Sequence, residues 1–307
     1  MALLVAELVL ANPGFVLASH LAPRTSHGIS CQHKTWHHRR RTLERTPRLE
    51  PVPMRLILSK SREDAGERLA DTLAFAIGKN PHIKLGLSAG RTSILCYTGL
   101  VQRFHERGGF SFRHVTAFGT DEYVGLTPND HRSTRYLMNF HLFRQVDIPR
   151  EQTFVPRGDA KDLDAECKAW DMLIEARGGL DSVVLGLGHN GHVGLNEPGS
   201  SPKSRMRVAP LTPSTLAALS DGSRFKNLES TPQTAITMGM GTILEAREVL
   251  LIATGLGKAD ALHKMVEGRS GPSVPASLLL NHPKLTIFAD RDAASRLDDA
   301  SLAKAEK

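Results

Sequence analysis

The chain has 307 residues, of which 40% are hydrophobic and 23% charged, a composition that is ordinary for a globular protein. No apolar run reaches the length of about 18 residues that a membrane-spanning helix needs, so we expect no membrane segment. The formal net charge is +7, but in residues 1–53 seven Lys/Arg face three Glu, which leaves the rest nearly balanced. This distribution favours a small-molecule ligand over nucleic acid as the partner.

Residues 1–53 lack the periodicity of folded elements. An apolar start gives way to a segment rich in His, Arg, Thr and Pro, and a clean strand pattern begins only at Met54. We therefore predict that residues 1–53 are a disordered extension or precede the true start, with one domain over residues 54–307. An Arg-rich transit peptide is the alternative.

The three cysteines, at positions 31, 96 and 167, are widely spaced and odd in number. They match neither a disulfide framework nor a zinc-binding spacing, which is typical of a reducing compartment. We expect a cytoplasmic protein.

From Met54 onward, strand and helix patterns alternate. Short apolar runs predict strands at 56–58, 83–87, 114–118, 183–187, 235–238, 249–254 and 285–289. Apolar stripes at helical spacing predict helices at 61–78, 95–104, 129–143, 162–176, 212–219, 242–246, 258–267 and from 293 onward. This alternation, without an internal repeat, predicts an α/β fold: a doubly wound, mostly parallel, Rossmann-like sheet with helices on both faces.

Two strand-to-helix turns could bind an anion. The second strand runs into a small-residue turn at 88–93, and the strand at 249–254 runs into Gly255-Leu-Gly-Lys258. Unpaired N–H groups at a helix start attract phosphate. On the pattern alone, a plain turn and a surface lysine remain equally good interpretations.

Asp121 and Glu122 follow the third strand. Neighbouring residues of an extended chain point to opposite faces, so one carboxylate can face a ligand while the other caps or pairs. The pattern alone favours purely structural roles for both.

The most distinctive stretch is 181–198, in which a buried strand leads into repeated glycines and polar residues. Ligands of open parallel sheets bind beyond the carboxyl ends of the strands, so His189, Asn190, His192 and Glu197 are site candidates. The alternative is an ordinary glycine-rich loop. His189 and His192 have no third ligand nearby in sequence, and we expect no metal site.

Several separated motifs together resemble the glucosamine-6-phosphate deaminases: the strings at 120–126, 186–198, 200–207, 238–244 and 255–258. The resemblance covers about residues 54–290. It implies conversion of glucosamine 6-phosphate and water to fructose 6-phosphate and ammonia, an amino-sugar reaction that needs neither metal nor organic cofactor. Relatives occur as monomers and hexamers, so a homo-oligomer is possible.

The resemblance also implies roles for individual residues. Asp121 corresponds to the base that moves a proton, His192 to the ring-opening histidine, and Glu197 to the carboxylate beside it. Asn190 stands where the best-known members carry an aspartate that is grouped with the histidine. The implied phosphate-binding residues are Gly90, Arg91, Thr92, Arg224 and Lys258.

Three departures bear on activity or its regulation. Asn190 cannot take up a proton, so the base role at that position is lost and His192 and Glu197 must suffice. The phosphate loop reads Ala-Gly-Arg-Thr rather than Thr-Gly-Gly-Thr, so that Arg91 adds a cation or crowds the loop. Ser200 and Arg207 match the family's allosteric site, but Ala209 stands at its lysine position, so the sequence leaves allosteric activation open.

Three other functions stay open. A galactosamine-6-phosphate deaminase resembles residues 186–199 about as well, although the Asp-Glu-Tyr form at 121–123 favours glucosamine. A 6-phosphogluconolactonase-like hydrolase shares the Gly-His core but is expected to lack Asn196-Glu197-Pro198. A sugar-phosphate sensor without turnover would carry a helix-turn-helix before this domain, and residues 1–53 show no such periodicity.

Overall fold

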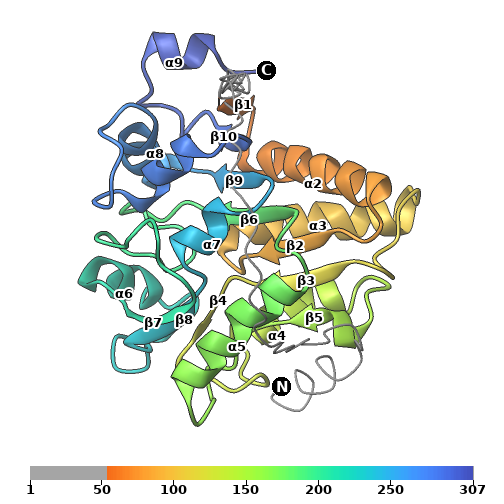
Figure 1. Cartoon of the computed structure of the whole chain (residues 1–307). Coiled ribbons are helices and arrows are strands. Elements are labelled where there is room, and N and C mark those ends of the chain that lie inside the picture. Colours follow the sequence, from red (N-terminus) through yellow and green to blue (C-terminus); the bar gives the residue numbers. More distant parts are fainter. Residues whose placement is uncertain (1–53, 307) are drawn as a thin grey trace, which may run out of the picture. The chain divides into compact units, whose positions relative to one another are not determined.

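A computed structural model describes residues 54–306, so the predictions for residues 1–53 lie outside the described part. Seven strands form a sheet in which every neighbouring pair is parallel. In spatial order they are β1 (Arg55–Ser59), β10 (Leu285–Asp290), β9 (Val249–Ala253), β6 (Ser182–Gly186), β2 (Lys84–Leu87), β3 (Thr116–Gly119) and β5 (Thr153–Phe154) (Figure 1). The chain proceeds outward from β2 through β3 to β5, then returns to β6 and proceeds outward the other way. The strand order therefore reverses between β2 and β6, and such a switch point is where open α/β sheets bind ligands.

Helices cover both faces of this sheet, which confirms the predicted α/β class. One face packs against α2 (Arg62–Lys79), α3 (Arg91–Glu106), α4 (Thr134–Met138) and the π-helix η1 (Asn139–Phe143). The other packs against α5 (Leu163–Ala176), α7 (Met240–Leu244), α8 (Ala259–Val266) and the 3-10 helix η4 (Pro275–Asn281). Side chains alternate between these layers, as in β6, where Val183 and Leu185 enter one core and Val184 the other.

A second sheet departs from the single sheet that the sequence predicts. Strands β4 (Asp121–Tyr123), β8 (Thr234–Thr237) and β7 (Arg207–Pro210) pair antiparallel, with β8 in the middle. A third small core holds this sheet against α6 (Pro213–Leu219); it includes Tyr123, Leu216, Phe225 and Ala235. The predicted strand at 235–238 thus exists but lies outside the parallel sheet.

Local side-chain contacts explain where several helices begin. Ser61 caps α2 as predicted, accepting a hydrogen bond from the Asp64 N–H at 3.2 Å. The helix predicted at 129–143 begins only at Thr134, because Asp130 accepts from the Arg132 N–H in a turn and Ser133 then caps the helix. The helix predicted from 293 onward is wrong in extent: after turns, only α9 (Asp299–Ala303) forms, capped by Asp298.

The remaining helical elements are the 3-10 helices η2 (Arg150–Gln152) and η3 (Leu256–Lys258). Across residues 54–306, none of the helices has the length and apolar character that crossing a lipid bilayer requires.

Candidate active site

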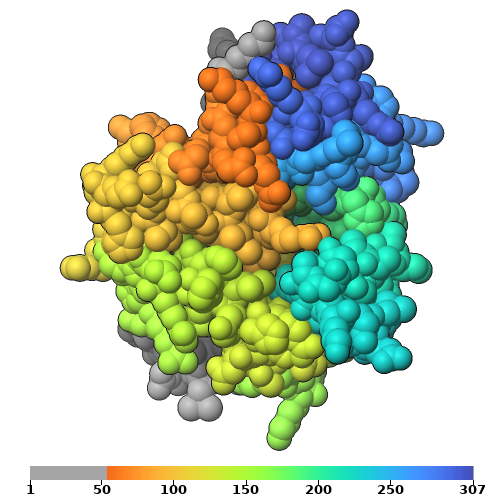
Figure 2. All heavy atoms as spheres, turned by 180° about the vertical axis from the view of Figure 1, so that it is seen from behind, coloured from red at the N-terminus to blue at the C-terminus, as the bar shows by residue number. Residues whose placement is uncertain are grey.

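A cavity of about 600 Å³ lies at the switch point, lined by the segments that follow β2, β3, β6 and β9. Its wall on one side comes from α6 and the loop after it. In the space-filling view this teal segment lies beside the amber and yellow-green surface of the earlier part of the chain (Figure 2). Eight of the ten predicted site residues line the cavity: Gly90, Arg91, Thr92, Asp121, His189, His192, Arg224 and Lys258. The other two, Asn190 and Glu197, are not in the lining but contact the loop of His192.

Asp121 occupies the first position of β4 and faces the cavity. The Thr120 hydroxyl donates to its Oδ2 at 2.7 Å, and the Thr134 hydroxyl lies 3.4 Å from its Oδ1. Burial raises the pKa of the Asp121 carboxyl, against the lowering effects of the Thr120 hydrogen bond and the Arg224 charge. A carboxylate with a raised pKa is a better proton acceptor and donor near neutrality.

Glu122 points the other way, as the alternation predicts. Its carboxylate accepts the backbone N–H groups of Tyr123, Thr134 and Arg135 at 2.8, 2.9 and 3.1 Å. Glu122 is therefore a cap for α4, and it fixes the strand that presents Asp121.

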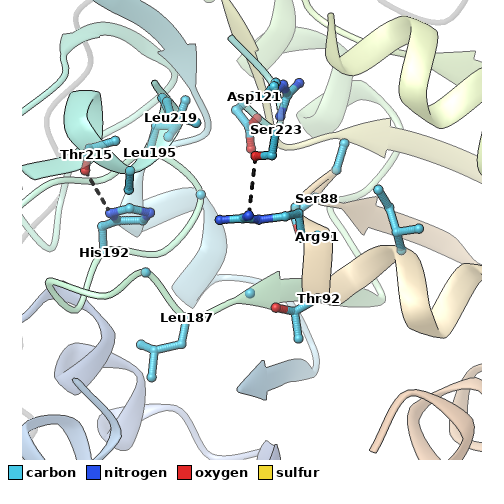
Figure 3. A pocket seen from close by; sticks show the side chains of 18 of the residues that line it. Ser88, Arg91, Thr92, Asp121, Leu187, His192, Leu195, Thr215, Leu219 and Ser223 are labelled. Atoms are coloured by element: carbon cyan, nitrogen blue, oxygen red, sulfur yellow. Dashed lines mark hydrogen bonds between the residues drawn. The ribbon is translucent and has the colours of Figure 1, made fainter. Parts of the chain in front are cut away.

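His192 lies in the loop after β6, and its ring is held at the Nδ1 atom. Its Nδ1 lies 3.4 Å from the Thr215 hydroxyl (Figure 3). Glu197 Oε2 lies 3.6 Å from the same nitrogen. The other ring nitrogen, Nε2, is available to a ligand in the cavity. An imidazole held at Nδ1 by a hydroxyl and a carboxylate can exchange a proton at its free nitrogen.

Asn190 bridges this arrangement. Its Nδ2 donates to Glu197 Oε2 at 2.7 Å, and its Oδ1 accepts the His192 N–H at 3.2 Å. A carboxylate at position 190 would place a second anion against Glu197, whereas an amide donates to it. The amide therefore suits a positioning role next to an ionised Glu197.

Part of the cavity lining, called the cationic end below, carries the cations Arg91, Arg224 and Lys258. Helix α3 begins at Arg91 with Gly90 as a cap that offers no side chain, so its first N–H groups are free for an anion. The Arg224 guanidinium donates to the Arg132 carbonyl at 2.8 Å and lies over the Tyr123 ring, 4.6 Å from its centre. Lys258 is half-buried at the start of α8.

Comparison with known proteins assigns the chain to a family. The model for glucosamine-6-phosphate isomerases and 6-phosphogluconolactonases matches residues 59–287. The chain belongs to this family. A glucosamine-6-phosphate deaminase of Geobacillus sp. (strain WCH70) is 41% identical over 246 residues, covering 80% of this chain and 97% of that protein. One from Bacillus velezensis is 41% identical over 241 residues, covering 78% and 99%.

Solved structures of the same family share the fold. A monomeric glucosamine-6-phosphate deaminase superposes with a TM-score of 0.76 at 37% identity, covering 79% of this chain and 100% of that one. A 6-phosphogluconolactonase from Trypanosoma brucei reaches a TM-score of 0.65 at 17% identity, covering 80% and 100%. At that identity the likeness concerns the fold alone.

The sequence did not predict that Thr215 belongs to the site. Thr215 is buried in the first turn of α6, which Thr212 caps, and it contacts the His192 ring from 23 positions further along the chain. The capping threonine was visible in the sequence, but its nearness to His192 follows only from the packing of α6. Within residues 54–306 no group of three or more His, Cys, Asp and Glu side chains is placed to hold a metal ion.

Glu197 should make the stability of this protein depend on pH. Burial would raise its pKa, but hydrogen bonds from His192, Thr215 and Asn190 together with the His192 charge lower the pKa from 4.5 to about 2. The folded state thus gains about 3 kcal/mol above the unfolded-state pKa, and loses it as pH falls from about 5 to about 2. Glu197→Gln should be less stable than wild type in urea unfolding at pH 7, and the difference should shrink toward pH 2. The exposed Glu151→Gln variant serves as control, and an equal pH dependence of both variants would contradict this prediction.

Gly188 leaves room for the His192 ring. A Cβ at position 188 would lie 2.4 Å from the Cδ2, Cε1 and Nε2 atoms of His192, so the imidazole would have to move. Since a displacement of about 1 Å can cost about 100-fold in rate, Gly188→Ala should lower kcat by roughly 10- to 100-fold with little change in Tm. Gly271→Ala, whose Cβ would meet nothing within 4 Å, is the matched control. Wild-type turnover of Gly188→Ala would mean that His192 acts from another position.

Proposed function

We propose that this protein is a glucosamine-6-phosphate deaminase that converts glucosamine 6-phosphate and water to fructose 6-phosphate and ammonia. One observation carries the proposal: the carboxylate of Asp121, the imidazole of His192 and the cations of Arg224 and Lys258 line the same cavity. The relatives of about 41% identity that bear this name support it.

The first step opens the sugar ring, and His192 fits it. Ring opening needs a group that gives a proton to the ring oxygen and removes one from the anomeric hydroxyl. An imidazole can do both near neutral pH. Glu197, whose Oε2 lies 3.6 Å from Nδ1, keeps the ring oriented. Thr215 supports the same orientation.

The second step moves a proton from carbon 2 to carbon 1 of the open sugar, and Asp121 is the carboxylate in the cavity that can carry it. The product is an imine at carbon 2. Addition of water to this imine and departure of ammonia leave the ketone of fructose 6-phosphate. General acid–base catalysis of this kind contributes roughly 100- to 10,000-fold in rate.

The cationic end holds the phosphate during these steps. The free N–H groups at the start of α3, the Lys258 ammonium and the Arg224 guanidinium provide charge-assisted hydrogen bonds to phosphate oxygens. Binding energy gained there positions carbons 1 and 2 between Asp121 and His192.

Residues 54–307 are proposed to form the catalytic domain, because the matched region and the cavity both lie within the described part of it. A cytoplasmic location is also proposed, since Cys96 and Cys167 are free and buried, as suits a reducing compartment. The homo-oligomer stays a prediction, which light scattering on purified protein would check.

Ammonia release tests the function. Purified protein should release ammonia and fructose 6-phosphate from glucosamine 6-phosphate. Parallel assays with galactosamine 6-phosphate and with 6-phosphogluconolactone separate the two alternative enzymes. Thermal stabilisation by a sugar phosphate without any product would instead indicate a sensor.

A further inference from the structure

Arg91 does not point freely into the cationic end of the cavity. Its Nη1 donates to Ser223 Oγ at 3.3 Å (Figure 3) and to Asp221 Oδ2 at 3.2 Å. Arg91 therefore joins the start of α3 to the loop after α6. Arg91 and Ser223 both line the cavity, while the Arg91 side chain is 70% exposed. The contact therefore stands at the mouth of the cavity.

Asp221 is oriented for this contact by its own turn. Its Oδ1 accepts both the backbone N–H of Ser223, at 2.9 Å, and the Ser223 hydroxyl. Gly222 between them adopts a φ of +85°, a conformation that favours glycine. One carboxylate oxygen thus stabilises the turn, and the other is presented to the Arg91 guanidinium.

The Arg91 guanidinium also affects Lys258 in the cationic end of the cavity. Arg91 and Lys258 line the same cavity, and burial, followed by the positive charge of Arg91, lowers the pKa of the Lys258 ammonium. Lysines that form ion pairs within residues 54–306 are Lys84, Lys264 and Lys284, and Lys258 is not among them. An anion between Arg91 and Lys258 would relieve this repulsion.

We propose that Asp221 is an internal competitor that occupies Arg91 until the phosphate of the substrate displaces it. This inference rests on the proposed function of the cavity as a sugar-phosphate site. A phosphate monoester dianion offers more charge than a carboxylate, and guanidinium binds it in a bidentate manner. An exposed Arg–Asp ion pair contributes little to stability, so phosphate displaces Asp221 readily. Competition by Asp221 therefore lowers the affinity of the cavity for phosphate by only about two- to fivefold.

Asp221→Asn tests the exchange, because an asparagine oxygen can still accept the Ser223 N–H and keep the turn. The variant should lower KM for glucosamine 6-phosphate and Kd for inorganic phosphate, each by about two- to fivefold, and the change should fall on KM rather than on kcat. Arg91→Gln should raise both constants. In the Arg91→Gln background, Asp221→Asn should have no further effect.

Glu229→Gln is the matched control, since it removes the same charge from an exposed position of the same segment. It should leave KM and Kd unchanged. The proposal is overturned if Asp221→Asn raises KM, if Glu229→Gln has the same effect, or if the effect persists without Arg91. The Kd for inorganic phosphate is measured without turnover, so it tests the exchange separately from the proposed reaction. If the protein is inactive on glucosamine 6-phosphate but Asp221→Asn still lowers this Kd, the exchange is supported and the proposed reaction is not.

Discussion

Asp121→Asn should lower kcat for glucosamine 6-phosphate by about 100- to 10,000-fold while the protein stays folded. The amide cannot accept the proton of carbon 2, but its oxygen can still accept the Thr120 hydroxyl. Since burial raises the pKa of Asp121 above 3.8, the acidic limb of the kcat/KM profile should lie above that value in wild type. Steady-state kinetics over pH and a thermal melt of each protein check both expectations.

Glu122→Gln is the control for this experiment, because it changes the neighbouring carboxylate in the same way. A glutamine side chain has one acceptor oxygen for three backbone N–H groups, so Glu122→Gln should lower Tm, while its loss of activity per folded molecule should stay far below that of Asp121→Asn. Normal turnover of Asp121→Asn, or a loss of turnover in Glu122→Gln that matches it, would remove Asp121 from the role of base.

Lys258→Met should raise KM for glucosamine 6-phosphate by about 100-fold, because hydrogen bonds between a partly buried charge and phosphate contribute about 1.5–3 kcal/mol each. Tm should stay the same or rise. The half-buried ammonium makes no ion pair within residues 54–306, and its pKa is lowered by burial and by the Arg91 charge, so removing it relieves a cost. Kinetics, phosphate binding and thermal melts measure the two opposite effects.

Lys168→Ala, at an exposed position of α5 that does not line the cavity, controls for the loss of one positive charge. A Lys258→Met variant with wild-type KM would place the phosphate elsewhere. A clear fall in Tm would instead give Lys258 a structural role that the described contacts do not show.

The parallel sheet could be predicted because its central strands β6, β9 and β10 are mainly apolar and almost wholly buried. In β9, for example, all five residues from Val249 to Ala253 are buried. The turns after β2 and β6 were visible as small and polar residues that interrupt such runs. Strand order then brings those turns together, as the switch-point rule predicts.

The small antiparallel sheet could not be predicted in the same way. Strand β4 is only three residues long, carries two carboxylates, and pairs with a strand more than 100 positions away. Neither periodicity nor composition records such a pairing. The same holds for the contact of Thr215 with His192 and for that of Arg91 with Asp221: each is formed by packing between segments distant in sequence.

The register in which β4 pairs with β8 determines whether the carboxylate of Asp121 or that of Glu122 faces the cavity. Asp121 lies opposite Thr237, and Glu122 lies opposite Ile236. A slip of one residue would turn Glu122 inward and send Asp121 to the backbone of α4, because successive side chains alternate. Lengthening or shortening the chain by a single residue between β3 and β4 would therefore be far more damaging than most substitutions there, and laboratory evolution of this protein should tolerate no insertions or deletions at that junction.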